Sequence, residues 1–340
     1  MKVVVTGAAG YIGTLLLRAL VKKAELVDRT GRMRPIDEIV MFDVNFPADE
    51  PVPASSEGPK IRRVTGSVAD AALLKETVKG DAVSVFHLAA VLTGVTERDL
   101  TTALQVNVDG TRNVLAALAE CGEGSRLVTT SSVTVFTRDA ADSPVTDNAA
   151  VRSSSVYGTT KIISEQLVSA FRIAGQVDGR CARLSTVVIR PKKIGVSAGA
   201  SISDVLRDVA LGRPCDILVE PSTRSGLIDY DSCVNGLIRL HEVDAAALAG
   251  NPIVNFPALS ASIAEMEAAA QESAKQHGRT PGPTRRTHNA FAQKTIDSWP
   301  TVIDGSRAEK LGITCRKSLA DICDNFLHDY ETFWSARVNA

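Results

Sequence analysis

Short runs of apolar residues alternate along the chain with longer segments in which apolar residues recur at helical spacing. The first run covers residues 3–5, and the segment that follows it, residues 11–21, has the helical period. Strands that alternate with helices form parallel sheets, so the pattern predicts an α/β fold with a Rossmann-type doubly wound parallel sheet. Later runs of the strand type occupy residues 38–43, 60–64, 82–87, 126–132, 181–191 and 252–257.

Helices are expected between these runs and beyond the last of them. Proline and glycine in residues 29–35 indicate a loop instead. Ser262 and Glu265, three positions apart, have the spacing of a capping box, which marks the start of a helix. The segments expected to be helical are residues 110–120, the segment that opens around Ser155, and residues 202–211, 260–276 and 319–334.

Composition narrows the class of protein without identifying it. The 340 residues carry a formal net charge of −1, which gives no reason to expect a nucleic acid or an anionic membrane as partner. No segment approaches the ~20 apolar residues that span a bilayer. The six cysteines form no C-x-x-C pair, which is typical of reduced thiols in a cytoplasmic protein. His87 has no further ligand at a suitable spacing, so a satisfied strand-end histidine is expected there, and no metal.

Three glycines, each three positions from the next, lie between the first strand and the first helix. A turn of this kind lets the backbone approach a pyrophosphate closely and aims the N–H groups of a helix start at the negative charge. Its place between a strand and a helix predicts a dinucleotide site rather than a plain tight turn. The residues of this turn are Gly7, Gly10, Tyr11, Ile12 and Gly13.

The second expected strand ends in an acid, Asp43. In a dinucleotide-binding fold an acid at this strand end accepts hydrogen bonds from the ribose hydroxyls of the adenosine. The same charge repels a 2′-phosphate, and no arginine follows Asp43 directly. The sequence therefore predicts NAD, rather than NADP, as the cofactor.

Tyr157 and Lys161 lie four positions apart in an expected helix, so both side chains project from one face of it. They follow the fifth expected strand, which ends at Ser132. Oxidation of an alcohol requires a base, and free tyrosine has a pKa of ~10, too high for that task near neutrality. A neighbouring ammonium favours the phenolate, so we predict Tyr157 as general base, Lys161 as its activator and Ser132 as hydrogen-bond partner of the substrate oxygen. Ser131 and Thr134 are alternatives to Ser132.

The glycine turn and the Tyr157–Lys161 pair together resemble the extended branch of the short-chain dehydrogenase/reductase superfamily, the NAD-dependent epimerase/dehydratase family. The resemblance covers nearly the whole chain. It implies that Lys161 also binds the nicotinamide ribose and that Tyr157 contacts the cofactor. Members usually carry an aspartate for the adenine where this chain has Ser67. The further cofactor contacts that the resemblance implies are Ser67, Val68, Leu88, Ala89, Ala90, Asn107 and Thr186.

The same resemblance implies that the chain folds into two domains and forms a homodimer. Residues 1–186 with about 225–257 are expected to form the NAD-binding Rossmann domain. Residues 187–224 with 258–340 are expected to form a smaller C-terminal substrate-binding lobe. Helices in residues 99–120 and 157–174 commonly form a dimer face in the superfamily, so a homodimer is expected.

Three features resemble the D-erythronate dehydrogenase group of this superfamily: residues 183–191, the small-residue loop 197–201, and the tail that begins at Trp299. This resemblance implies NAD-dependent oxidation of the C2 hydroxyl of a small sugar acid such as D-erythronate to the 2-oxo acid. A carboxylate substrate needs a cationic partner, and arginine suits planar carboxylates best. Arg224 is the first candidate, and the alternatives are Lys192, Arg190 and the loop that includes Ser197.

Two other functions are open at this point. A nucleotide-sugar epimerase/dehydratase of the same superfamily would hold NAD tightly and show no net cofactor turnover. The segment between Thr186 and Arg224 is short, which leaves little room for a nucleotide. A non-catalytic dinucleotide sensor would need no base, so the set of Ser132, Tyr157 and Lys161 argues against it. A cytoplasmic enzyme with a small-molecule carboxylate substrate is therefore the leading prediction.

Overall fold

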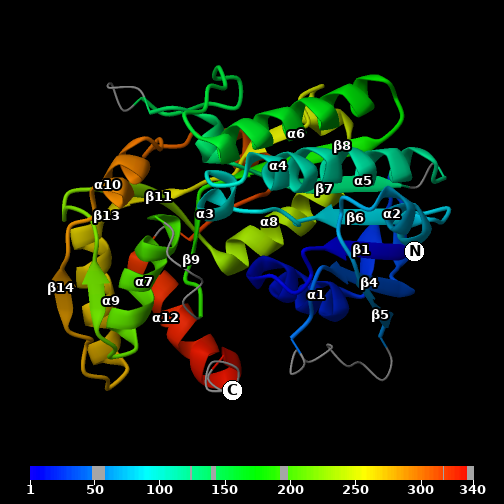
Figure 1. The fold of residues 1–340 in the computed structure, drawn as a ribbon. Helices are drawn as coiled ribbons and strands as arrows, with labels where there is room; N and C mark the ends of the chain where they lie inside the picture. Colours follow the sequence, from blue (N-terminus) through cyan, green and yellow to red (C-terminus); the bar gives the residue numbers. More distant parts are fainter. Residues whose placement is uncertain (48–57, 123–124, 139–142, 192–197, 317, 335–340) are drawn as a thin grey trace.

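A seven-stranded sheet forms the centre of the protein in the computed structural model (Figure 1). Its neighbouring strands all run parallel, in the order β12-β8-β7-β6-β1-β4-β5, which confirms the doubly wound α/β fold. The strands are β1 (Lys2–Thr6), β4 (Glu38–Asp43), β5 (Lys60–Thr65), β6 (Val83–His87), β7 (Arg126–Ser132), β8 (Asp178–Leu184) and β12 (Ile253–Asn255). The structure describes residues 1–47, 58–122, 125–138, 143–191, 198–316 and 318–334.

Helices cover both faces of this sheet (Figure 1). Val3 and Val5 of β1 pack with α1 and α8, whereas Val4 packs with α2 and α5, because successive residues of a strand face opposite sides. No helix in the described ranges is long and apolar enough to cross a membrane. The helices are α1 (Tyr11–Lys23), α2 (Ala71–Val78), α3 (Thr93–Thr96), α4 (Leu100–Ala103), the π-helical turn η1 (Leu104–Asp109), α5 (Gly110–Ala119), α6 (Val156–Ile173) and α8 (Tyr230–Glu242).

A smaller lobe lies beside the sheet, on the left in Figure 1. It contains a three-stranded sheet, β13-β11-β9, and a two-stranded sheet, β10-β14, packed with long helices. Its elements are β9 (Thr186–Val188), α7 (Ala198–Ala210), β10 (Cys215–Ile217), β11 (Arg224–Asp229), β13 (Leu259–Ser262), α9 (Ile263–Gln276), β14 (Thr284–Arg286), α10 (Ala290–Asp297), α12 (Leu319–Asp329) and the turn η4 (Tyr330–Trp334). Helix α11 (Ser306–Lys310) packs instead beside β12 of the large sheet.

The expected strand over residues 181–191 is divided between the two sheets. It leaves the large sheet at Leu184, and Thr186 already pairs with Leu227 of β11 in the small sheet. Strand β11 lies in the segment that we expected to complete the cofactor domain, but its hydrogen bonds go to β9 and β13. The boundary between the two sheets therefore passes through Ser185.

Two other expected segments begin or fold differently. The stretch 29–35 is part of a short hairpin, in which β2 (Glu25–Val27) pairs with β3 (Met33–Pro35). Helix α9 begins at Ile263, three residues later than expected, because β13 occupies the residues before it. The predicted capping box is confirmed, since Ser262 and Glu265 each accept a hydrogen bond from the other's backbone N–H.

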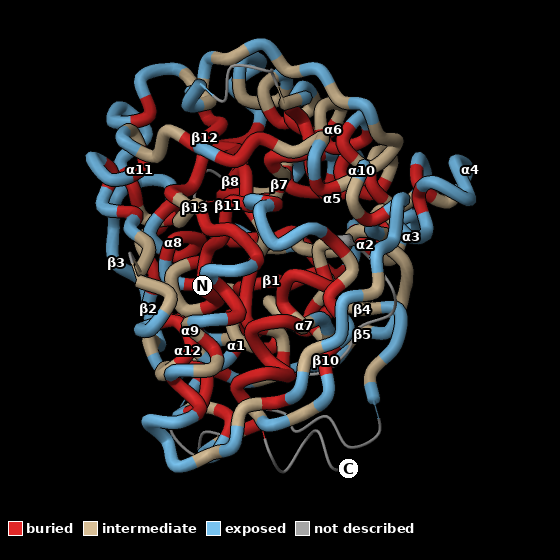
Figure 2. Tube along the Cα trace, turned by 90° about the vertical axis from the view of Figure 1, so that its left-hand side faces the viewer, coloured by how far each residue is buried: buried red, intermediate tan, exposed pale blue. Residues whose placement is uncertain are grey.

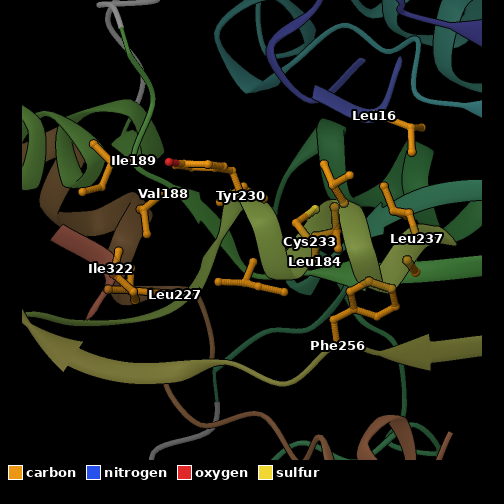
Figure 3. Packing of buried hydrophobic residues seen from close by; sticks show 14 of the residues in the cluster. Leu16, Leu184, Val188, Ile189, Leu227, Tyr230, Cys233, Leu237, Phe256 and Ile322 are labelled. Carbon is orange, nitrogen blue, oxygen red and sulfur yellow. The ribbon is translucent and has the colours of Figure 1, made fainter. Parts of the chain in front are cut away.

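Strands β1, β6, β7 and β8 of the large sheet are buried along most of their length, whereas the edge strand β5 is mostly exposed (Figure 2). The main apolar cluster continues from the sheet into the lobe without a break. Figure 3 shows Leu237 and Phe256, which pack on the sheet, in the same cluster as Leu227 and Ile322 of the lobe. The two parts are therefore held together by a shared core, and the space between them is fixed by packing.

Candidate functional site

Two adjoining cavities open at the carboxyl ends of the central strands. The larger, about 600 Å³, lies outside β1 and β6, at the switch point where doubly wound sheets bind their ligands. We call it the groove; the smaller, about 260 Å³, is the small cavity, between the sheet, α3, α7 and α10. The residues that line both are Leu92, Thr130, Tyr157, Leu184, Val187 and Arg190.

The glycine turn borders the groove and has no room for side chains. Gly7 has a φ of +71°, and a Cβ on it would lie 2.8 Å from the backbone nitrogen of Ala89. A Cβ on Gly13 would lie 2.2 Å from the carbonyl oxygen of Gly7. The bare backbone and the start of α1 together fit the diphosphate of a dinucleotide. The predicted turn residues Gly7, Gly10, Tyr11, Ile12 and Gly13 all line the groove.

Asp43 lies at the end of β4 and lines the groove. Its Oδ2 accepts a hydrogen bond from the N–H of Ala9 at 2.9 Å, and its Oδ1 accepts one from the N–H of Val44 at 2.7 Å. The carboxylate is thus held against the glycine turn, with acceptor capacity left for ribose hydroxyls. Ser67 and Val68, the expected adenine contacts, also line the groove.

The loop after β6 supplies another wall. Leu88, Ala89 and Ala90 line the groove, where the family resemblance implied cofactor contacts. Asn107 does not line it: the side chain is buried behind the loop, where Oδ1 accepts from the N–H of Val91 at 2.9 Å and Nδ2 donates to the carbonyl oxygen of Val91 at 3.1 Å. Asn107 therefore fixes the loop backbone.

Thr186 was also expected to contact the cofactor. It lines the small cavity and not the groove. Its hydroxyl lies 3.3 Å from that of Ser225 on the neighbouring strand. The switch of the chain from β8 to β9 moves this residue toward the lobe.

Tyr157 and Lys161 project from one face of α6, beside the end of β7. Lys161 Nζ lies 5.7 Å from the centre of the Tyr157 ring and donates a hydrogen bond to the carbonyl oxygen of Thr130 at 3.0 Å. Tyr157 and Lys161 line the groove, and Tyr157 and Ser132 line the small cavity. The three predicted catalytic residues are thus brought together where the two cavities meet.

The start of α6 is fixed by two side chains. The Ser155 hydroxyl accepts a hydrogen bond from the N–H of Gly158 at 3.0 Å and caps the helix. Glu97 Oε1 accepts one from the N–H of Tyr157 at 3.2 Å. The backbone that carries the phenol is thereby held in place.

Burial and charge act in opposite directions on the phenol. Burial raises the pKa of Tyr157 to about 12, and the guanidinium of Arg190 acts to lower it. Burial lowers the pKa of Lys161 to about 8. Arg190, which the sequence had not linked to Tyr157, is the charge that acts to lower this pKa in the structure, and Lys161, 5.7 Å from the ring centre, stays the predicted activator. Such a phenol is protonated at neutrality and needs added positive charge to serve as a base.

Arg190 follows β9 and lines both cavities. Its backbone N–H donates to the hydroxyl of buried Ser203 at 2.7 Å, and its carbonyl oxygen accepts from Arg207 Nη1 at 3.5 Å. Within the described part of the chain, its guanidinium has no hydrogen-bond or ion-pair partner. An arginine of this kind is suited to bind an anionic group from a ligand.

Arg224, the first candidate for a substrate carboxylate, lines neither cavity. Its side chain is exposed, with Nη1 3.1 Å from Glu265 Oε2 and Nη2 donating to the carbonyl oxygen of Ser260 at 3.0 Å. The carboxylate that caps α9 thus already engages this guanidinium. Lys192 and Ser197, the other candidates, lie outside the described residues.

Tyr11 connects the glycine turn to the lobe. Its hydroxyl donates to the carbonyl oxygen of Ile189 at 2.8 Å, one residue before Arg190. Its ring centre lies 6.2 Å from that of Tyr230 and 6.1 Å from that of Trp334 near the C-terminus. The turn and the segment that carries Arg190 are therefore joined directly.

His87 has a structural role, as the sequence indicated. Its Nδ1 lies 2.7 Å from the hydroxyl of Thr6 and its Nε2 3.2 Å from that of Thr111. Burial lowers the pKa of His87 to about 3, so the ring is neutral near neutrality. The imidazole ties β1, β6 and α5 together.

The small cavity contains residues that the sequence did not assign to a site. Some lie on or next to the strands β7, β8 and β9, namely Thr130, Val133, Leu184, Ser185 and Val187. The others come from α3, α7 and α10 with their flanks, which are far apart in the chain and join only in the fold. A single tryptophan or phenylalanine carries no spacing signal, so no pattern indicated them. They are Leu92, Thr93, Gly94, Glu97, Arg98, Gly199, Phe291, Thr295 and Trp299.

The order of the sheet, with a glycine turn at its switch point, defines a doubly wound dinucleotide-binding protein. The chain belongs to the NAD dependent epimerase/dehydratase family, whose sequence model matches residues 3–254. It is an oxidoreductase, and its cofactor is NAD(H).

Proteins similar to this chain in sequence or structure include dehydrogenases and an epimerase. A D-erythronate dehydrogenase from Cupriavidus necator is 30% identical over 329 residues, 97% of this chain and 98% of that protein. A D-erythronate dehydrogenase from Haemophilus influenzae is 25% identical, over 96% and 99% of the two chains. The crystal structure of a nucleoside-diphosphate-sugar epimerase from Agrobacterium tumefaciens superposes with a TM-score of 0.85, at 27% identity, over 98% of this chain and 95% of that one.

Proposed function

We propose that the protein oxidises the C2 hydroxyl of a small sugar acid, such as D-erythronate, to the 2-oxo acid with NAD. The proposal is supported by Arg190, which lines both cavities together with Tyr157 and whose guanidinium has no hydrogen-bond or ion-pair partner among the described residues. An arginine beside the base selects a substrate whose carboxylate lies next to the carbon that reacts. The similarity to two D-erythronate dehydrogenases supports this substrate class.

In this proposal the side chains of the site bind the substrate, transfer its proton and hold the cofactor. Ser132 donates a hydrogen bond to the substrate C2 oxygen, and Tyr157 accepts the proton of that hydroxyl. Arg190 binds the carboxylate and lowers the pKa of Tyr157, while Lys161 hydrogen-bonds the nicotinamide ribose. NAD, when bound, accepts the hydride. Glu97 holds the backbone of Tyr157, so the phenol stays in place as the proton moves.

The size of the small cavity supports a small acid over a nucleotide sugar. Its volume of about 260 Å³ lies below the ~300–1,000 Å³ of cavities that hold drug-sized ligands. A sugar linked to a nucleoside diphosphate exceeds that space. A nucleotide-sugar epimerase with tightly bound NAD is therefore not favoured.

We propose NAD rather than NADP because the Asp43 carboxylate is held at the edge of the glycine turn. We also propose a homodimer formed through α4, η1 and α6, and a reducing, cytoplasmic location. Leu100 and Leu104 are exposed apolar side chains on the first two of these elements, as interfaces between subunits require. The six cysteines, which all lie in the described ranges, form no disulfide, and this suits a reducing compartment.

The test is NADH formation, followed by absorbance, on a panel of four- to six-carbon aldonic acids alongside UDP-sugars. We expect turnover of a four-carbon acid with NAD and loss of that turnover in Tyr157→Phe. Interconversion of UDP-sugars without net NADH, and no oxidation of any acid, would overturn the proposal. Bound NADH should be measured in the variant as well, so that a failure to bind cofactor is not read as a lost base.

A further inference from the structure

Three buried hydroxyl groups in the wall of the small cavity have no hydrogen-bond partner within the described part of the chain. They belong to Ser131, Thr134 and Ser185, each at most about one-tenth exposed. Buried hydroxyls in native proteins are nearly always paired, so a cluster without partners in one cavity wall requires an explanation. None of the three has a task in the proposed mechanism.

All three surround Ser132. Ser131 directly precedes it on β7, and the N–H of Thr134 donates to the Ser132 hydroxyl at 3.2 Å. Ser132 pairs in register with Leu184 of β8, and Ser185 is the next residue along. Neighbouring parallel strands lie about 4.8 Å apart, so the three residues are grouped around the place where the reacting oxygen binds.

We propose that Ser131, Thr134 and Ser185 form a subsite for the remaining hydroxyl groups of a polyhydroxylated acid. The inference rests on the proposed function, because the carboxylate bound by Arg190 and the C2 oxygen at Ser132 fix the head of the substrate. The rest of its carbon chain then extends along the wall that carries these side chains. Each of the three hydroxyl oxygens is itself shielded from the cavity in the structure. The proposal therefore includes a rotation about the Cα–Cβ bond of each residue, which turns its hydroxyl toward the ligand.

The chemistry of the three side chains matches that of sugar hydroxyls. A serine or threonine hydroxyl offers one donor and two acceptors, and so does an alcohol. A site built to hydrogen-bond a substrate hydroxyl strongly rejects the analogue that lacks it, since its own polar groups then stay unpaired. The protein therefore selects a hydroxylated chain over a deoxygenated chain of the same length.

The experiment compares D-erythronate with its 3-deoxy analogue and with 2-hydroxybutanoate, which all keep the carboxylate and the C2 hydroxyl. We expect kcat/KM with NAD to fall at least about tenfold for each hydroxyl removed. In Ser131→Ala, Thr134→Val and Ser185→Ala that discrimination shrinks, because D-erythronate loses activity while 2-hydroxybutanoate keeps it. The control is Ser273→Ala, a buried serine on α9 whose hydroxyl donates to Asp324, and the discrimination there stays at the wild-type value.

Affinities measured by calorimetry on the NADH-loaded protein separate this inference from the proposed function. If no acid is oxidised but affinity still falls with each missing hydroxyl, and the three variants abolish that trend, the subsite stands and the oxidation proposal fails. Equal kcat/KM and equal affinity for all three acids would overturn the subsite and leave the dehydrogenase intact. Unchanged discrimination in all three variants would also overturn it.

Discussion

Arg190 and Tyr157 lie on the wall that separates the groove from the small cavity, and each of them lines both. Of the charged side chains that line these cavities in the described part of the chain, only Arg190 belongs to both. It is also the charge that lowers the pKa of Tyr157, against the effect of burial. The guanidinium that acts on the phenol in the ligand-free site is thus also placed to contact a ligand in either cavity.

Replacing Arg190 by glutamine should affect both affinity and pH dependence. A hydrogen bond to a charged group contributes about 1.5–3 kcal/mol, so KM for the acid should rise roughly 10- to 100-fold. Oxidation needs unprotonated Tyr157, and loss of the cation raises its pKa in the free enzyme, so the rising limb of kcat/KM against pH should move to higher pH. The matched control is Arg224→Gln, which removes an exposed guanidinium and should leave both properties unchanged. If KM rises but the pH profile of the variant matches that of the wild type, Arg190 binds the carboxylate without influencing the pKa of Tyr157.

Lys161 should set an alkaline limit on activity. Its pKa is lowered by burial to about 8, so the ammonium is lost as the pH rises through that value. We expect kcat to decline above about pH 8 in the wild type and to persist to higher pH in Lys161→Arg, since arginine keeps its charge. Lys161→Met removes the charge at every pH and should lower kcat about 10²- to 10⁴-fold. If kcat of Lys161→Arg declines above about pH 8 as in the wild type, a group other than Lys161 causes the decline.

Asp43 should determine the choice of cofactor. Removing the carboxylate in Asp43→Ser takes away ribose hydrogen bonds and the repulsion of a 2′-phosphate. We expect KM for NAD to rise about tenfold or more and the ratio of kcat/KM for NAD over NADP to fall by a larger factor. The control Asp216→Asn alters an exposed carboxylate paired with Arg285 in the lobe and should leave this ratio unchanged. Equal preference in Asp43→Ser and wild type would contradict the assignment.

Acid should destabilise the fold through His87. Its pKa is about 3 when folded, against about 6.5 when unfolded, so between these values the unfolded chain binds the extra proton. The free energy of unfolding should therefore fall as the pH drops below 6.5, by up to about 1.4 kcal/mol per pH unit from this group. His241, whose pKa burial also lowers, adds to the effect in the same direction. Above pH 6.5 neither histidine contributes.

Urea unfolding between pH 7 and pH 4.5 measures this dependence. His87→Gln should have a smaller slope by about one proton, even if its stability at pH 7 is lower. His288→Gln, at an exposed histidine beside Glu220, serves as control and should keep the wild-type slope. An unchanged slope in His87→Gln would show that the ring is protonated in the folded state.

The large sheet and the groove were predictable because their signals are local. Strands β4 and β7 coincide with apolar runs that had been assigned from the sequence, and the glycine turn and Asp43 lie at strand ends that the pattern indicated. Parallel strands bring their carboxyl ends to one edge, so the pattern also implied that these residues meet. The pair Tyr157 and Lys161 needed only helical spacing.

The small cavity was less predictable because its residues come from separate segments. Arg224 and Arg190 both stand near strands of the small sheet, and only the pairing of β11 with β13 shows that Arg224 lies beside Glu265, outside the cavity. The division of the 181–191 strand at Ser185 has no local signal, since apolar residues precede it at Leu184 and follow it at Val187 and Val188 without a proline or glycine between them. Long-range register, rather than propensity, decides both cases.

The hydrogen bond from Tyr11 to Ile189 has a consequence for the kinetic order of the two ligands. The residue that borders the diphosphate position anchors the peptide next to the guanidinium proposed to receive the acid. A dinucleotide that orders the glycine turn therefore also positions Arg190. The acid finds the guanidinium in its binding position only after the cofactor is bound. We expect an ordered kinetic mechanism in which the cofactor binds first and the acid second, and product-inhibition patterns would reveal it. In Tyr11→Phe, which keeps the ring and removes the hydroxyl, that sequence should relax toward random entry.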